Sequence, residues 1–394
     1  MKSNKTNLKK KIIVVSGSRA DFGIMRKFLK KLNTHKKFKL NLVATGSHLI
    51  KNYGMTINEI KKNKIKVCKK IFIDQKNETP HNISVSSSII LRQLSKAVMS
   101  IKPDFAIIFG DRYEMLISSY LFTLYQVPIV HIGGGELTEG SYDNQFRHSI
   151  SKMSNLHFVS HHTYKKRLIS MGENPKTIFN FGSLSTDNLK KENFLTLKKL
   201  STKYGLNFKR ENFLVTFHPL TLDSKQTFRQ FKILVNAINQ FKKYNFIFTA
   251  SNADQEGNKI NKYINHLVKK HKNFFYIKSF GQKNYFSVLR YVKGVIGNSS
   301  SGLTEVPSFK IGTINIGDRQ KGRVKSESII DSKANKNSIT LAIKKIISSK
   351  FKRKLRKVKN PFAKKNTADK IIRVLIKFNF NKNKKIFYEK NTRK

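Results

Sequence analysis

Cysteine is almost absent from this sequence, and its absence narrows the class of protein. Only one of the 394 residues, Cys68, is a cysteine. A disulfide within the chain is therefore impossible, and a metal cluster held by several thiolates is excluded.

Long apolar runs are also missing. The basic stretch Met1–Lys11 precedes an apolar run, Ile12–Val15, that is too short for a signal peptide. No stretch approaches the roughly 20 apolar residues that cross a bilayer as a helix. We therefore expect a cytoplasmic protein with no membrane partner.

Acidic residues are scarce, since 23 Asp and Glu stand against 79 Lys and Arg, for a formal net charge of +56. Such an excess would ordinarily suggest a nucleic acid or an anionic membrane as partner. The lysines, however, lie along the whole chain rather than in one patch. Lys, Asn, Ile and Phe, which have AT-rich codons, are all abundant, so genome composition can account for much of the excess. We expect no nucleic-acid partner, although the positive field should attract anionic substrates.

Several common site motifs are missing as well. The glycines after the first apolar run have the spacing of neither a GxGxxG fingerprint nor a P-loop. There is no GxSxG nucleophile elbow and no tightly spaced set of metal ligands.

The chain is long enough for two domains, and 39% of its residues are hydrophobic, so a substantial core can form.

What the sequence does contain is a regular alternation of short apolar runs and helical patterns. In the first half, strands are predicted at residues 12–15, 40–44, 65–73, 105–109, 127–132, 156–159 and 178–181. In the second half they are predicted at residues 213–217, 245–250, 274–277, 294–297 and 313–316. This alternation predicts an α/β protein with two doubly wound, Rossmann-like domains that face a cleft.

A break in the alternation at Gly182–Asp187 sets the expected domain boundary. The predicted domains are residues 1–185 and residues 186–394, the second with a strongly basic tail from Lys350 onward. Within that tail, Ile371–Phe378 is amphipathic and predicts a closing helix, while the charged remainder predicts a solvated face.

The stretch from His131 to His148 concentrates groups that can do chemistry. The strand Val127–Ile132 leads into three glycines, Gly133–Gly135, which permit close approach to the backbone. Three carboxylates and an arginine then follow, at Glu136, Glu139, Asp143 and Arg147. A helix that starts near Asp143 would place Arg147 one turn later. Open α/β sheets bind ligands at this end of their strands, although a glycine loop with a capped helix is the structural alternative.

Two other strand ends in the first half carry similar groups. The turn Ser16–Gly23 would present backbone N–H groups and Arg19 to an anion. The turn Gly110–Glu114 carries Asp111 and Arg112, and Asp111 could be either a site residue or the N-cap of the next helix.

The second half offers groups that suit a diphosphate. Ser299, Ser300 and Ser301 form a hydroxyl-rich turn before a short helix, which can bind phosphate or simply cap that helix. One strand later, the loop Gly317–Arg323 brings arginines that can grip phosphate in bidentate fashion. Further candidates lie at neighbouring positions, namely His218, Asn252, Glu305, Arg319 and Arg323.

Taken in order, these motifs resemble a known family. They are Ser16–Gly23, Gly110–Glu114, His131–Met153, Phe217–Pro219 and Gly297–Arg323. Together they closely resemble the hydrolysing UDP-N-acetylglucosamine 2-epimerases of bacterial sialic acid synthesis, over a match from about Lys11 to Asp331. The resemblance implies a two-domain GT-B fold that holds UDP mainly in the C-terminal domain. It also implies conversion of UDP-N-acetylglucosamine and water to N-acetylmannosamine and UDP, no metal or nicotinamide cofactor, and a homodimer.

The resemblance also assigns roles to residues. By it, Asp111 and Asp143 are catalytic carboxylates and His218 belongs to the site. By it, the nucleotide contacts are Arg19, Ser299, Ser300, Glu305 and Arg319. To these we add Glu136 as a catalytic candidate. We add as substrate-binding candidates Arg112, Arg147, Asn252, Ser301 and Arg323.

One position departs from the family pattern. Some members carry a catalytic Glu or a His where this chain has Gly133, so that role must pass to Glu136, Glu139 or water, or else be lost. Besides the N-acetylglucosamine epimerase, three alternatives stay open: an epimerase of a UDP- or GDP-linked diacetamido (bacillosamine-type) sugar on the way to legionaminic acid, on which close relatives act, a GT-B glycosyltransferase with the same fold, and a non-catalytic sugar-nucleotide binder, which the missing side chain at Gly133 allows.

Overall fold

The chain folds into two compact units, which are described separately below. The computed structural model describes residues 8–50, 55–73, 79–139, 142–187, 189, 194–219, 224–251, 255–380 and 385–389. Unit 1 comprises Met1–Glu136, Asp143–Asp187 and Lys364–Lys394. Unit 2 comprises Leu137–Tyr142 and Asn188–Ala363.

Unit 1 is built on a seven-stranded parallel sheet with the order β3-β2-β1-β4-β5-β6-β7. Its strands are β1 Lys10–Ser16, β2 Phe38–Ala44, β3 Val67–Lys70, β4 Phe105–Phe109, β5 Ile129–Ile132, β6 Leu156–Val159 and β7 Ile178–Asn180. The order reverses direction between β1 and β4, which is where a doubly wound sheet opens a crevice for ligands.

Successive side chains of a strand point to opposite faces of the sheet, and helices cover both faces here. Ile12 and Val14 join the core beneath one group of helices, and Ile13 and Val15 join the core beneath the other. The first group is α1 Arg19–Thr34, α2 Ile57–Lys62, α7 Leu184–Asp187 and α15 Thr367–Lys377. The second group is α3 Pro80–Ile101, α4 Tyr113–Leu124 and α5 Asp143–Met153. The helix α6 His162–Ser170 packs beside β6 and β7.

Unit 2 repeats the plan with a six-stranded parallel sheet of order β10-β9-β8-β11-β12-β13. Its strands are β8 Asn212–Thr216, β9 Asn245–Thr249, β10 Phe274–Ile277, β11 Val292–Gly297, β12 Gly312–Ile316 and β13 Ile329–Ser332. One face is covered by α9 Ser224–Ile238, α10 Gln255–Lys270, α13 Lys336–Ile347 and α14 Ser349–Lys357. The other face is covered by α8 Leu197–Tyr204, α11 Gly281–Leu289 and α12 Ser301–Thr304.

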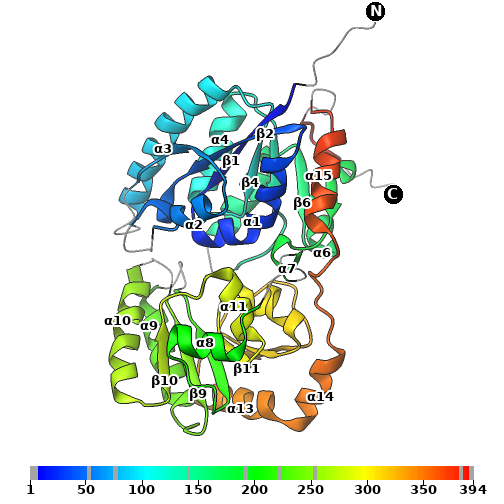
Figure 1. Cartoon of the computed structure of the whole chain (residues 1–394). Helices are drawn as coiled ribbons and strands as arrows, with labels where there is room; N and C mark the ends of the chain where they lie inside the picture. Colours follow the sequence, from blue (N-terminus) through cyan, green and yellow to red (C-terminus); the bar gives the residue numbers. More distant parts are fainter. Residues whose placement is uncertain are drawn as a thin grey trace, which may run out of the picture. The chain divides into compact units, whose positions relative to one another are not determined.

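The predicted fold class, with two parallel-sheet α/β domains, is confirmed, and each predicted strand is present with its ends shifted by a few residues at most. The predicted boundary differs from the observed units at the end of the chain. The sequence pattern places residues 364–394 in the second domain, but α15 lies against α1 (Figure 1), and Ile371 and Leu375 are buried in the core of unit 1. The amphipathic pattern predicts the helix but carries no signal for the sheet that it covers.

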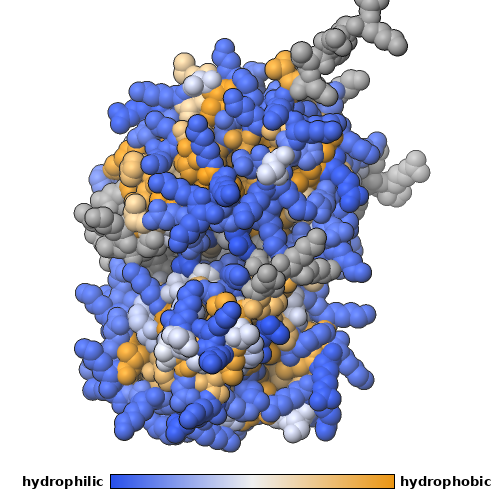
Figure 2. Space-filling view, in the orientation of Figure 1, coloured by the Kyte–Doolittle hydropathy of each residue, from blue (hydrophilic) through white to orange (hydrophobic). Residues whose placement is uncertain are grey.

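The basic tail is also less solvated than its charge suggested. In α14, Phe351 and Leu355 pack into the core of unit 2 while the lysines and arginines face outward. The face drawn in Figure 2 is largely hydrophilic, as expected for a chain this rich in lysine. Among the described residues, no helix combines the length and the apolar character needed to cross a bilayer.

Candidate functional site

In unit 1, Asp111, just after the end of β4, and Arg147 of α5 come together. Asp111 is not the N-cap of α4, since that position is Arg112. Instead, the Asp111 carboxylate forms an ion pair with the guanidinium of Arg147. Arg147 is 2% exposed and Asp111 is 24% exposed, so the carboxylate keeps access to solvent while its partner is buried. Arg147 Nη1 also donates to the carbonyl of Glu136 at 2.9 Å, which fixes the guanidinium plane.

A buried histidine, His131, connects the two segments that carry this pair. His131 lies in β5, with Nε2 2.9 Å from the carbonyl oxygen of Gly110 and Nδ1 3.0 Å from Oγ of Ser151. Because a carbonyl can only accept, Nε2 carries the proton and Nδ1 accepts from the hydroxyl. Burial lowers the pKa of His131 to about 3, so the ring is neutral at physiological pH. His131 therefore joins the turn before Asp111 to the helix that carries Arg147.

Helix α5 begins at Asp143, as the sequence predicted, and places Arg147 one turn and Ser151 two turns later. Ser151 Oγ also lies 3.0 Å from the carbonyl oxygen of Arg147. Glu136, which follows the glycines after β5, accepts a hydrogen bond from Ser160 through Oε1 at 3.2 Å. Asp111, Asp143, Glu136 and Arg147 thus all belong to unit 1, at the carboxyl end of its sheet.

Gly133 has a conformational reason to be glycine. Its φ is +94°, a region that L side chains rarely adopt, and a Cβ there would meet only the backbone nitrogen of Gly110, at 3.8 Å. Space for a side chain therefore exists, but the backbone disfavours one.

Two more arginines of unit 1 have acidic partners. Arg19, in the first turn of α1, pairs through Nε with Glu59 of α2 at 3.2 Å. Arg112 pairs through Nε with the fully buried carboxylate of Glu114 at 3.1 Å. Nearby, burial raises the pKa of Asp21 to about 6, against the opposing effect of Arg112. Sequence reasoning named neither Glu59 nor Asp21 as a site residue.

In unit 2, the buried side chain of Asn298 organises the ends of β8 and β11. Its Oδ1 accepts from the backbone N–H of His218 at 2.7 Å, and its Nδ2 donates to the His218 carbonyl at 2.8 Å. The carbonyl oxygen of Asn298 accepts from Arg319 Nη1 at 3.2 Å and from Gln320 Nε2 at 2.8 Å. The imidazole of His218 is neutral, because burial and the neighbouring Arg319 lower its pKa to about 3.

The serine turn is held in a defined conformation. The Ser299 hydroxyl accepts from the Ser301 backbone N–H at 3.4 Å, and Ser301 Oγ lies 2.6 Å from the hydroxyl of Tyr285 in α11. Ser300 is the N-cap of α12 but makes no side-chain capping bond. Glu305 is 7% exposed at the end of α12, so it is not a solvated helix residue.

The remaining candidates lie around the loop Gly317–Arg323. Arg323 Nη2 is 3.4 Å from Oγ1 of Thr138, and Lys321 Nζ is 3.1 Å from a carboxylate oxygen of Glu139. Glu139 therefore belongs to unit 2, and its grouping with the carboxylates of the first domain is wrong. Asn252 lies outside the described residues.

Sequence reasoning missed the residues that brace the site. His131, Ser151, Asn298, Gln320 and Tyr285 make the contacts above, yet none was a candidate. Two signals could have found some of them. His131 is a polar residue inside an otherwise apolar strand, and Asn298 directly follows a strand at the start of the serine turn. Tyr285 and Gln320 carry no comparable local signal.

The chain is similar in sequence to proteins of known family. The family model described as UDP-N-acetylglucosamine 2-epimerase matches residues 30–376. The chain is 42% identical over 346 residues to the GDP/UDP-N,N'-diacetylbacillosamine 2-epimerase (hydrolyzing) of Campylobacter jejuni, covering 87% of this chain and 89% of that protein. It is 39% identical over 383 residues to the polysialic acid biosynthesis protein P7 of Escherichia coli, covering 96% of this chain and 97% of that protein.

A solved structure supports the fold independently. The crystal structure of UDP-GlcNAc 2-epimerase from Neisseria meningitidis bound to UDP-GlcNAc superposes with a TM-score of 0.80 at 16% identity, covering 93% of this chain and 100% of that one. At that identity the likeness concerns the fold alone, which is of the GT-B type with two parallel-sheet α/β domains.

Proposed function

Because the chain belongs to the UDP-N-acetylglucosamine 2-epimerase family, we propose that it converts UDP-N-acetylglucosamine and water to N-acetylmannosamine and UDP. The ion pair between Asp111 and Arg147 is the observation that carries the proposal. A carboxylate that is held by a buried guanidinium and keeps access to solvent is positioned and oriented to exchange a proton with a substrate.

The chemistry needs two acid/base groups. The C2 hydrogen of the sugar has no adjacent carbonyl to acidify it, so direct deprotonation would be slow. Cleavage of the C1–O bond releases UDP with the bonding electron pair and leaves positive charge at C1. A carboxylate then removes the C2 proton, which gives a 2-acetamidoglucal. Water adds at C1 while a proton returns to C2 from the other face, so the sugar leaves with inverted C2.

We assign the proton transfers to Asp111 and Asp143. Both belong to unit 1, and Asp143 shares α5 with the arginine that holds Asp111. Glu136 is the reserve candidate, since its carboxylate already accepts from Ser160 and its carbonyl from Arg147. Each positioned acid/base group typically contributes about 10²–10⁴-fold to the rate.

We assign the nucleotide to the cationic and hydroxyl groups of unit 2. Arg319 and Arg323 supply positive charge for a departing diphosphate, and Ser299 and Ser300 supply hydroxyls at the start of α12. Glu305 would bind the ribose hydroxyls. A neutral His218 suits hydrogen bonding to the substrate better than protonation of it. From unit 1, Arg19 and Arg112 complete the proposed contacts.

One assay tests the reaction. The protein is incubated with UDP-N-acetylglucosamine in D₂O and followed by NMR. We expect free UDP and N-acetylmannosamine that carries one deuterium at C2, because the returning proton comes from solvent. Retention of the original C2 hydrogen in the product would rule out the elimination route. Tight binding with intact substrate would indicate a sugar-nucleotide binder, and sugar release only with an added acceptor would indicate a glycosyltransferase.

The relative at 42% identity favours a second candidate substrate, a UDP- or GDP-linked N,N'-diacetylbacillosamine on the way to legionaminic acid. Parallel measurement of kcat/KM for this sugar nucleotide and for UDP-N-acetylglucosamine decides between them. We also propose a homodimer, for which family membership is the support, and light scattering on the purified protein tests it.

A further inference from the structure

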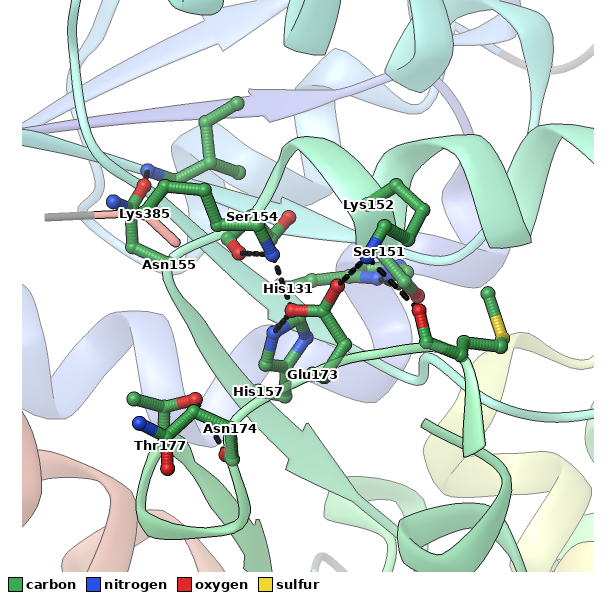
Figure 3. Close-up of polar contacts among 12 residues, drawn as sticks. His131, Ser151, Lys152, Ser154, Asn155, His157, Glu173, Asn174, Thr177 and Lys385 are labelled. Carbon is green, nitrogen blue, oxygen red and sulfur yellow. Dashed lines mark hydrogen bonds and ion pairs between the residues drawn. The ribbon is translucent and has the colours of Figure 1, made fainter. Parts of the chain in front are cut away.

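Outside the proposed site, unit 1 contains a buried cluster of charges around Glu173. This carboxylate is only 2% exposed. It is approached by three basic side chains from three different parts of the chain (Figure 3). These are Lys152 at the end of α5, His157 in β6 and Lys385 in the segment Lys385–Glu389. Burial raises the pKa of Glu173, but hydrogen bonds and charge from these partners outweigh it, and the net direction is downward.

The contacts of this cluster converge on the end of α5. Lys152 Nζ lies 2.9 Å from Glu173 Oε1 and donates to the carbonyl of Met171 at 2.9 Å. Lys385 Nζ donates to Glu173 and also to the carbonyl of Ser154 at 2.8 Å, just after the last residue of α5. Ser151, the helix residue directly before Lys152, contacts His131. The last turn of α5 is therefore held on two sides.

The segment that contributes Lys385 has further contacts of its own. The N–H of Tyr388 donates to the carbonyl of Gly172 at 3.0 Å. The ring of Phe387 lies over Gly172, where a Cβ would come within 2.6 Å of it, and Lys152 Nζ lies 4.6 Å from the centre of the same ring. Lys385, Phe387 and Tyr388 thus contact Glu173, Lys152 and Gly172, while the Phe387 side chain stays 67% exposed.

We propose that Glu173 and the segment Lys385–Glu389 together position α5, and through it the pair Arg147–Asp111. Ser151 and Lys152 lie one turn after Arg147, so a shift of this helix end moves the guanidinium that holds Asp111. The role assigned here is positioning, since the contacts of these groups are with one another and with the end of α5. For its kinetic readout the proposal rests on the proposed function.

The main test compares three variants. Lys385→Met removes the charge that the segment brings, and Lys385→Arg restores it. Lys31→Met is the matched control. It removes another lysine–acid pair of unit 1, the one between Lys31 of α1 and Asp369 of α15. A misplacement of about 1 Å can lower a rate on the order of 10²-fold. We expect Lys385→Met to lose at least about 10-fold in kcat with the Kd of UDP unchanged. Lys385→Arg and Lys31→Met should stay within about twofold of wild type.

Hydrogen exchange gives a readout that does not depend on turnover. Lys385→Met should speed exchange in residues 143–153, and Lys31→Met should not. Phe387→Ala should do the same to a lesser degree. Phe72→Ala is its control, because Phe72 is comparably exposed, at 61% against 67% for Phe387. If Lys385→Met matches Lys31→Met in both kcat and exchange, the positioning proposal is overturned. If the wild-type protein turns over neither sugar nucleotide, the proposed function fails while the exchange comparison still decides the positioning role.

Discussion

Asp111 carries one of the two carboxylates proposed to transfer protons. Arg147 is buried and pairs with it, so an uncharged replacement at position 111 would leave a guanidinium without its counter-ion. Breaking a buried pair by removing one partner typically costs about 3–5 kcal/mol. We expect a cost at or below the low end of that range, because Asp111 itself is partly exposed.

Asp111→Asn and Asp143→Asn keep the size of the side chain but cannot accept a proton. Each should lower kcat by at least about 10²-fold with little change in the Kd of UDP, because the groups proposed for the nucleotide lie in unit 2. Steady-state kinetics and UDP titration measure the two quantities. If elimination and hydration use different carboxylates, one variant should release the glucal before water adds. Wild-type rates in both variants would move the chemistry to Glu136.

Asp21 predicts a pH dependence of stability. Burial raises its pKa to about 6, above the value of about 3.9 expected in the unfolded chain. The folded state therefore binds the proton more tightly. The stabilisation is complete below the unfolded pKa and is lost as the pH rises through about 6.

The measurement is urea unfolding of the wild type and of Asp21→Asn at several pH values. Asn cannot titrate, so the free energy of unfolding of the variant relative to wild type should rise between about pH 4 and pH 6 and then level off. Contributions of the other groups cancel in the difference. A difference that stays flat across this window would contradict the assignment.

At the scale of elements, helices and strands were largely predictable and their bracing contacts were not. The apolar run Phe105–Phe109 and the start of α5 at Asp143 carry strong local signals, and both are present. The bond from His131 to Gly110 joins positions on neighbouring strands, and only the strand order brings them together. Tyr285 of α11 likewise contacts Ser301 of α12 only because the fold packs these two helices near each other. Local patterns predict which segments form, while such partners depend on the packing of segments distant in sequence.

The turn after β5 gives a prediction at this scale. Gly133→Ala places a Cβ on a backbone with φ +94°, where the strain should cost about 1–3 kcal/mol although the space is open. Gly133→Glu should be destabilised to a similar extent, since the strain arises in the backbone.

Thermal and urea unfolding measure this loss, and Gly17→Ala is the matched control. A Cβ at Gly17 would have its closest contact at 3.4 Å from Glu114, an ordinary distance, and its φ is not in the left-handed region. The conformational explanation fails if Gly133→Ala is as stable as Gly17→Ala.

At the scale of the whole molecule, the chain does not divide at a single point. Leu137–Tyr142 belongs to unit 2 although the segments on both sides belong to unit 1, and Lys364–Lys394 returns to unit 1 after unit 2 is complete. The sequence break at Gly182–Asp187 predicted the main crossing and neither of these exchanges. Lys321 pairs with Glu139, and α15 buries Leu375 against unit 1, but both are long-range contacts that leave no mark in composition or periodicity.

The net charge of +56 is the remaining property of the whole molecule, and it leads to the last prediction. Hydrophilic residues cover much of the face drawn in Figure 2, and 79 Lys and Arg stand against 23 Asp and Glu, so weak association with any polyanion is expected at low salt. Binding through phosphate contacts alone releases counterions, and 6–10 such contacts would lose about 10³–10⁵-fold in affinity between 50 and 200 mM salt. We therefore expect equal affinity for two DNA duplexes of the same length and unrelated sequence, with the same steep salt dependence. Fluorescence anisotropy over a salt titration measures both. A complex that persists at 200 mM salt and prefers one sequence would require a base-reading surface, and the charge would then be functional rather than compositional.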